Sequence, residues 1–104
     1  LLRLGKLEID LAQRSVIFKG VFLELTPIEY DLLVTLANRP GQVFTRLQLL
    51  EATQNVAYEG YERNIDQHIK NLRSKLQDDA RKPTYILTVF GVGYRLAREE
   101  NLYA

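Results

Sequence analysis

The sequence predicts an α+β domain in which a small N-terminal sheet, three helices and a C-terminal hairpin follow one another. Three observations predict this order. Short β-prone runs fill the first 25 residues, two helix start signals follow, and two β-rich runs flank a glycine pair near the end. The chain has 104 residues, 46% of them hydrophobic and 26% charged, as in ordinary globular proteins. This length suits one folding unit, so we expect a single domain over residues 1–104.

The N-terminal strands are predicted from three runs, residues 7–10, 15–18 and 21–25. Two of these runs alternate apolar and polar residues, and turn-forming residues near Arg14 and at Lys19-Gly20 separate them. We therefore expect an antiparallel sheet.

The first helix has a combined start signal. Thr26 is a suitable N-cap, Pro27 fits the first helical position, and Glu29 fits the third. Apolar residues then recur at helical spacing, at Ile28, Leu32, Leu33 and Leu36. Proline and glycine in the segment 38–41 end this helix.

The second helix begins with the same capping pattern, Thr45 followed by Gln48, and runs toward Thr53. Residues 55–61 have no hydrophobic period and contain glycine, so they are expected to form a loop.

The third helix is predicted from residue 63 to about residue 77. Its apolar residues recur at steps of four, three and four, at Ile65, Ile69, Leu72 and Leu76. The opposite face carries Arg63, Gln67, Lys70, Asn71 and Ser74, with Asn64 beside them. Such side chains match base edges and phosphates, and a helix fits the major groove of DNA. On these residues alone, a plain solvated face is the commoner explanation.

The C-terminal hairpin follows the break at residues 78–83. Two β-rich runs, residues 85–90 and 94–96, flank Gly91-Val92-Gly93. These glycines lie between strands and not before a helix, so they predict a tight turn, not a phosphate-binding loop.

The charge is nearly balanced, at +1, but unevenly distributed. Residues 1–60 hold six Lys/Arg against seven Asp/Glu, whereas residues 63–98 hold eight against three. A polyanion would be drawn to the second half, although a solvated charged surface explains the asymmetry equally well.

Catalysis and metal binding have little support. The chain has no cysteine and one histidine, His68, at the border of the buried stripe, where packing or a phosphate contact is the better interpretation. Asp78 and Asp79 are interpreted as solvated residues at a helix end, not as a carboxylate dyad. We expect no enzyme, no metal and no cofactor.

The first residues of the chain and its hydropathy bear on where the protein is located in the cell. No apolar run approaches the roughly 18 residues of a membrane span, and the start lacks a signal-peptide plan. We expect a cytoplasmic protein without a membrane partner. Because the first residue is Leu1 and not Met, we expect a piece of a longer protein.

Five motifs occur in order along nearly the whole chain. They are Leu25-Thr26-x-x-Glu29, Asn38-x-Pro40-Gly41, Thr45-Arg46-x-x-Leu49-Leu50, Arg63-x-x-Asp66-x-His68-Ile69-x-x-Leu72-Arg73-x-Lys75-Leu76 and Thr88-Val89-x-Gly91-x-Gly93-Tyr94-Arg95. Together they resemble the OmpR/PhoB-type winged-helix effector domain of bacterial two-component response regulators.

The resemblance implies a winged helix-turn-helix with an N-terminal four-stranded antiparallel sheet, a three-helix core and a C-terminal β-hairpin wing. The helix at about 63–77 would enter the major groove, and the wing at about 85–96 would approach the minor groove. It further implies sequence-specific binding of double-stranded DNA, a tandem pair of protomers on direct repeats, and a phosphorylatable receiver domain upstream.

The resemblance also assigns roles to residues. The base-reading positions fall on Asn64, Asp66, Gln67 and Asn71, and the phosphate contacts on Arg63, His68, Lys70, Arg73, Thr88 and Tyr94. The wing includes Phe90, Gly91, Val92 and Arg95. The loop 54–61, with Gln54, Asn55, Tyr58, Glu59 and Gly60, matches a segment that touches RNA polymerase in some members.

Three positions bear on specificity. Phe90 stands where many members carry an arginine for the minor groove, and Gln54 stands where they carry a tryptophan. Phe90 either packs under the wing or presses against sugar and base edges, and the lost cationic contact should lower the salt dependence of binding by about one phosphate. Asn71, often arginine in relatives, points to adenine over guanine.

Two other interpretations stay open. A winged-helix protein-interaction module with little DNA affinity is favoured by the near-neutral charge, the missing wing arginine and the tyrosines at 58 and 61 beside Gly60. A membrane-anchored or otherwise signal-fused regulator would use the same domain. Salt-sensitive DNA binding would distinguish a DNA-binding domain from the protein-interaction module. The full gene would show whether the domain is joined to a membrane anchor or another signal-receiving part.

Overall fold

The fold begins with a four-stranded antiparallel sheet. The computed structural model describes residues 1–53, 62–79 and 81–103. Strands β1 (Leu2–Leu4), β2 (Leu7–Asp10), β3 (Ser15–Phe18) and β4 (Val21–Leu23) pair in the order β1-β2-β3-β4. The three predicted strands and the fourth implied by the family resemblance are therefore confirmed.

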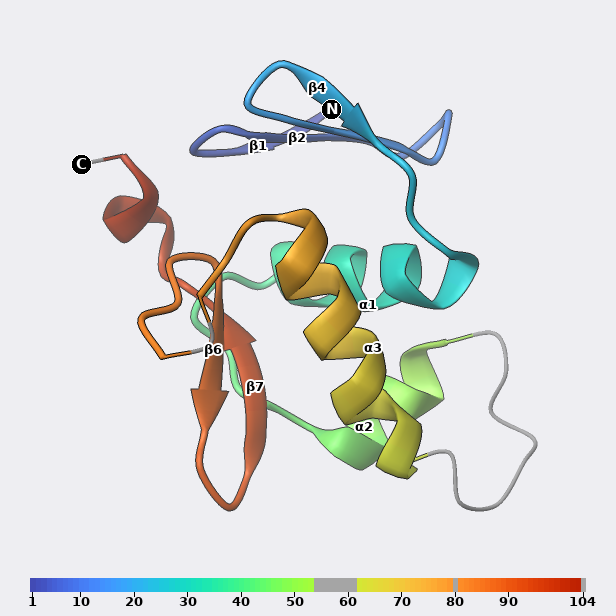
Figure 1. The fold of residues 1–104 in the computed structure, drawn as a ribbon, viewed down its shortest axis with the longest axis vertical. Coiled ribbons are helices and arrows are strands. Elements are labelled where there is room, and N and C mark those ends of the chain that lie inside the picture. Colours follow the sequence, from blue (N-terminus) through green and yellow to red (C-terminus); the bar gives the residue numbers. More distant parts are fainter. Residues whose placement is uncertain (54–61, 80, 104) are drawn as a thin grey trace.

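The sheet turns one face to the helices. Leu7, Ile9, Val16 and Phe18 alternate along β2 and β3 and are buried. This face lies over α1, and the sheet caps one end of the molecule (Figure 1).

Helices α1 (Pro27–Ala37) and α2 (Arg46–Ala52) begin where the capping signals predict. The Thr26 hydroxyl accepts a bond from the Glu29 N–H, and the Glu29 carboxylate accepts one from the Thr26 N–H. Thr45 and Gln48 make the same reciprocal pair at α2. Each pair satisfies two backbone donors that a helix start would leave unpaired.

Helix α3 (Glu62–Lys75) ends two residues before the predicted limit. Gln77 adopts a left-handed backbone conformation with φ of 54°. The Gln77 N–H then donates to the Ser74 carbonyl, and the Asp78 N–H to the Arg73 carbonyl. This closing pattern ends the helix although no glycine is present, which is why sequence alone placed the end too late.

The wing is a hairpin of β6 (Ile86–Val89) and β7 (Gly93–Leu96). Gly93 pairs with Val89 and belongs to β7, so the predicted turn at 91–93 is corrected to residues 90–92. A two-residue strand that the sequence did not predict, β5 (Phe44–Thr45), pairs with β7 on its other side. The chain closes with a 3₁₀ turn at Glu99–Leu102.

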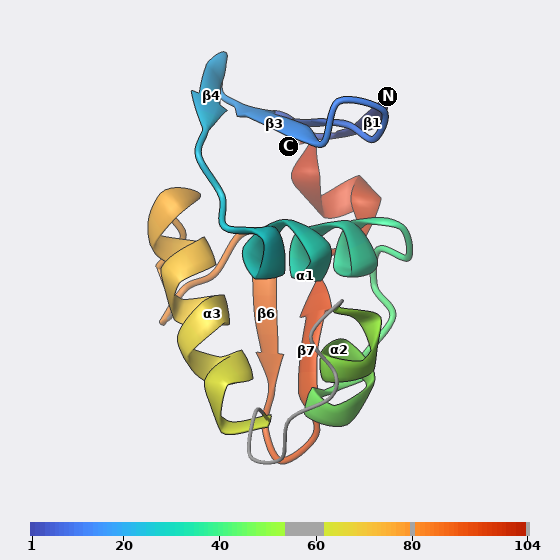
Figure 2. The ribbon, with the colours of Figure 1, turned by 90° about the vertical axis from the view of Figure 1, so that its right-hand side faces the viewer.

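The core joins the helices to both sheets. The predicted apolar stripes are confirmed as fully buried at Leu32, Leu33, Leu36, Ile65, Ile69, Leu72 and Leu76, whereas Ile28 is only half-buried against the core. In Figures 1 and 2, α1 lies between the N-terminal sheet and α2, β6 and β7. The N-terminal end of α3 and the tip of the wing both point away from that sheet, so they lie at one end of the molecule.

Candidate nucleic-acid interface

The outer face of α3 is polar and open to solvent. Gln67, Lys70 and Ser74 are exposed, opposite the buried stripe, and Asn71 is half-buried beside them. The Gln67 side-chain amide donates to Asn71 Oδ1 over 3.0 Å. The two amides, one helical turn apart, therefore form a paired surface of donors and acceptors.

Lys75 contributes little to this surface. Its ammonium group lies 2.6 Å from Glu29 Oε1, and the Glu29 side chain is only 3% exposed. Lys75 thus ties the end of α3 to the start of α1. One of the eight basic residues counted in residues 63–98 is therefore used to hold two helices together.

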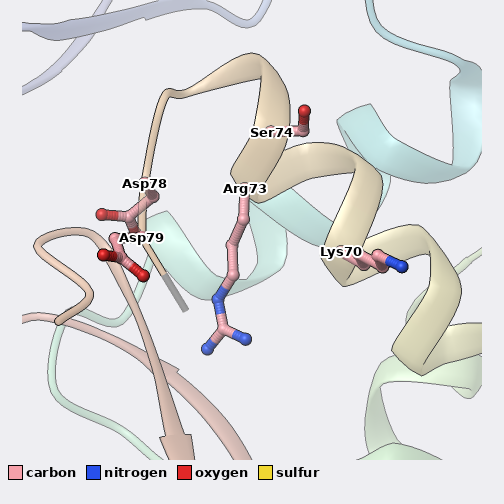
Figure 3. A pocket seen from close by; sticks show the side chains of 5 residues that line it. All are labelled: Lys70, Arg73, Ser74, Asp78 and Asp79. Carbon is pink, nitrogen blue, oxygen red and sulfur yellow. The ribbon is translucent and has the colours of Figure 1, made fainter. Parts of the chain in front are cut away.

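Arg73 joins α3 to the wing. Its residue is 8% exposed, and its guanidinium donates to the Ile86 carbonyl over 2.8 and 3.1 Å and to Thr88 Oγ1 over 2.7 Å. Figure 3 shows this side chain running down from the helix while Lys70 points away from it. Arg73 and Thr88, both predicted as phosphate contacts, are thus bonded to each other.

A second link connects α2, α3 and the wing through Asp66. Its Oδ1 accepts bonds from Arg46 Nε over 2.7 Å and from the Tyr94 hydroxyl over 2.6 Å. The Tyr94 ring also lies near the guanidinium groups of Arg46 and Arg73, at 5.6 and 5.5 Å from its centroid. The three elements that would face DNA are held together before any ligand arrives.

This second link shifts two pKa values. Partial burial acts to raise the pKa of Asp66, but the hydrogen bonds from Tyr94 and Arg46 and the charge of Arg46 outweigh it, so the pKa lies below its usual value. Burial, followed by the bond to Asp66, raises the pKa of Tyr94. Near neutral pH the pair is therefore an anionic acceptor and a protonated donor.

The tip of the wing is apolar and exposed. Phe90 is 90% exposed and Val92 is 46% exposed. Of the two environments expected for Phe90, the one under the wing is therefore wrong. Arg95, on β7, is half-buried.

Several predicted residues lie outside the described side chains. Arg63 and Asn64 belong to α3, but only their backbone is described, and the loop residues Gln54, Asn55, Tyr58, Glu59 and Gly60 are not described at all. His68 is half-buried, at the border of the stripe as predicted.

Sequence reasoning missed two structural features beside this interface. Arg46, the first residue of α2, occurs in one of the five motifs, but its bond to Asp66 was not predicted, although a cationic side chain beside a capping threonine was a visible signal. Asp78 was interpreted as solvated, whereas it is half-buried and its carboxylate accepts bonds from three backbone N–H groups, those of Thr84, Tyr85 and Ile86. It fixes the start of β6.

An open hollow of about 300 Å³ lies between the end of α3 and the following loop, lined by Lys70, Arg73, Ser74, Asp78 and Asp79. Its two cations are offset by two carboxylates (Figure 3). Across the described ranges, no three His, Cys, Asp or Glu side chains gather as a metal site. No helix described in residues 1–53, 62–79 and 81–103 is long and apolar enough to span a membrane.

The sequence has clear relatives. The family described as "Transcriptional regulatory protein, C terminal" matches residues 20–96. The DNA-binding response regulator MtrA of Mycolicibacterium smegmatis is 42% identical over 95 residues, which cover 91% of this chain and 42% of MtrA. The chain thus spans less than half the length of this relative.

Solved structures show the same fold. The DNA-binding domain of Klebsiella pneumoniae RstA, in complex with the RstA box, is 38% identical, with a TM-score of 0.82 over 91% of this chain and 94% of that one. The DNA-binding domain of the response regulator AdeR, in complex with an intercistronic region, is 33% identical, with a TM-score of 0.79 over 94% and 99%.

Proposed function

The chain belongs to the family of transcriptional regulatory protein C-terminal domains, the OmpR/PhoB-type winged helices, and from this premise we propose that it binds duplex DNA sequence-specifically. Helix α3 enters the major groove and the wing lies along the neighbouring minor groove. As the output domain of a response regulator, it would control transcription.

The observation that carries this proposal is the rigid joint between α3 and the wing. Arg73 bonds the helix to β6, and Asp66 bonds it to β7 through Tyr94 and to α2 through Arg46. A surface fixed in advance loses little conformational entropy on binding, so its contacts are available for affinity and register. The exposed polar face of α3 lies on this fixed frame.

The candidate contact residues suit different parts of a DNA duplex. Lys70 is exposed and carries a full charge, which suits a phosphate. Gln67 and Asn71 carry side-chain amides that match the hydrogen-bonding edge of adenine. To bind a base, they would exchange the hydrogen bond between them for bonds to that base. His68 and Thr88 are half-buried at the edges of this polar surface, and we propose that each contacts a phosphate there.

Asp66 and Tyr94 have divided roles in this proposal. Arg46 and Tyr94 both donate to Oδ1 of Asp66. Its other oxygen, Oδ2, is therefore the atom that would accept a hydrogen bond from a cytosine amino group. Tyr94 must redirect its hydroxyl from Asp66 if it is to donate to a phosphate. Arg73 acts by positioning the wing, and a phosphate contact would need its guanidinium to leave β6.

The partners follow from the family. We propose a receiver domain upstream, a tandem pair of protomers on direct repeats, and a cytoplasmic location. The segment 54–61, through Gln54, Asn55, Tyr58, Glu59 and Gly60, is the proposed contact with RNA polymerase. Arg63 and Asn64 are proposed as a phosphate contact and a base contact.

Selection of binding sites from random duplexes at low salt tests the proposed function. We expect the chain to enrich a repeated motif and Asn71→Arg to exchange adenine for guanine at one position of that motif, because asparagine pairs bidentately with adenine and arginine with guanine. Lys6→Ala, in the exposed turn between β1 and β2, is the control and should return the original motif.

Two outcomes would contradict this proposal. If Asn71→Arg enriches the same motif, Asn71 does not read a base. If neither protein enriches any sequence, the domain is a protein-interaction module and not a specific DNA reader.

A further inference from the structure

The wing of this chain carries an aromatic side chain at its tip. Phe90 is 90% exposed, the most exposed large hydrophobic residue in the described part of the chain, and Val92 beside it is 46% exposed. Leaving a phenylalanine side chain in water forgoes about 1.5–3 kcal/mol of burial free energy. An apolar pair at this position is therefore suited to a surface that covers it on binding.

The turn that carries Phe90 has a defined shape. The Val92 N–H donates to the Val89 carbonyl over 2.9 Å, and Gly91 takes a positive φ of 75°. Val89 and Gly93 pair directly beneath the turn. Phe90 consequently projects from a closed three-residue turn.

The position of the turn relative to α3 is also fixed. Arg73 bonds α3 to Ile86 and Thr88 on β6, and β5 pairs with the outer side of β7. The tip of the wing and the N-terminal end of α3 point in the same direction in both views (Figures 1 and 2). A duplex seated against α3 therefore continues past Phe90.

Cations flank the aromatic tip. Phe90, Arg95 and Arg81 line one open hollow of about 520 Å³ on the wing, together with Pro83, Leu87 and Thr88. Arg95 lies opposite Leu87 in the hairpin register. An apolar tip beside two guanidinium groups matches the minor groove, where sugars and base edges form the floor and phosphates form the walls.

We propose that Phe90 enters the minor groove as an apolar wedge and makes this wing a reader of DNA deformability. This inference rests on the proposed function and deepens it. Contact with sugars and base edges is easiest where a base step opens readily, so the wing selects pyrimidine–purine steps such as TA over stiff A-tracts. Arg81 and Arg95 bind the flanking phosphates. Since the Phe90 contact displaces no counterion, it adds affinity without adding salt dependence.

The test uses two duplexes with the same α3 site and either a TA step or an A-tract beneath the wing. We expect the wild-type chain to prefer the TA duplex. Phe90→Ala should lose on the order of tenfold in affinity for that duplex, with an unchanged salt slope and no remaining preference. Phe90→Leu, an apolar control, should keep most of the affinity, and Phe90→Arg should steepen the salt slope by about 0.9.

A spectroscopic measurement supports the affinity test. 2-Aminopurine placed at the TA step should fluoresce more strongly on binding the wild-type chain, because partial unstacking relieves quenching, and the increase should vanish with Phe90→Ala.

The possible results distinguish a failure of the Phe90 wedge from a failure of the proposed DNA binding. If Phe90→Ala leaves affinity, step preference and fluorescence unchanged while Lys70→Ala weakens binding, the wedge is wrong and the proposed function stands. If Phe90→Ala affects only the pairing of protomers on a repeat, Phe90 is a protein contact and the wedge is again wrong. If the wild-type chain binds no duplex, the proposed function itself fails.

Discussion

Replacing Gly93 with alanine is expected to destabilise the domain by about 3 kcal/mol or more. A Cβ at this position would lie 1.9 Å from the Phe44 carbonyl oxygen and 3.0 Å from the Thr45 Cα. These are backbone atoms of β5, so relief requires β5 to separate from β7. Because Thr45 also caps α2, the separation disturbs the start of that helix and the position of Arg46. Urea unfolding followed by circular dichroism measures the loss.

Gly91→Ala is the matched control for this effect. Gly91, unlike Gly93, has a positive φ, of 75°, but a Cβ there meets no other atom within 4 Å. Its cost should therefore be limited to the left-handed backbone, about 1 kcal/mol. Equal losses for the two variants would show that close approach of β5 is not what requires glycine at position 93.

Arg73→Met is expected to reduce the free energy of unfolding by roughly 2–4 kcal/mol and to weaken DNA binding as a consequence. The substitution removes the guanidinium that bonds Ile86 and Thr88 on the wing, while methionine keeps much of the apolar stem. Denaturant unfolding and DNA titration on the same samples measure both effects.

Lys70→Ala is the control on the same helix, three residues earlier and exposed. Its stability should change by less than about 0.5 kcal/mol, because surface substitutions rarely do more. If Arg73→Met is as stable as Lys70→Ala and loses only salt-dependent affinity, then Arg73 contacts phosphate and does not position the wing.

The helix starts were predictable from sequence because they depend on neighbouring residues. Each capping box joins residues three positions apart, so Thr26 with Glu29 and Thr45 with Gln48 could be identified without a fold. The apolar stripe of α3 was predictable for the same reason, since periodicity is a local property.

Strand β5 and the roles of Arg73 and Asp66 were not predictable in this way. Two residues show no alternation, and Phe44–Thr45 becomes a strand only because β7 lies beside it. Arg73 follows a buried leucine on a basic helix, and its burial depends on the hairpin 13 and 15 positions later. Asp66 meets Arg46 and Tyr94 across separations of 20 and 28 residues. Tertiary contacts of this kind leave no mark in a local pattern.

The candidate site shows the same division. Sequence spacing placed Gln67, Lys70 and Asn71 on one face, and the structure agrees. The charge count, however, gave only the excess of basic residues in the second half and could not tell which of them face solvent. Lys75 is paired with the buried Glu29, and Arg73 is buried and bonded to the wing, so fewer cations are free to face a ligand than the basic residues counted in this half.

The most direct test of the central claim is the salt dependence of binding to a selected duplex, measured for the wild-type chain, Lys70→Ala and the control Lys6→Ala. Each phosphate contact contributes about 0.9 to the slope of log affinity against log salt. The account predicts a steep slope for the wild type, the same slope for Lys6→Ala, and a slope lower by about 0.9 for Lys70→Ala. A flat slope for the wild type, or equal slopes for both lysine variants, would contradict the assignment of α3 as the DNA-binding helix.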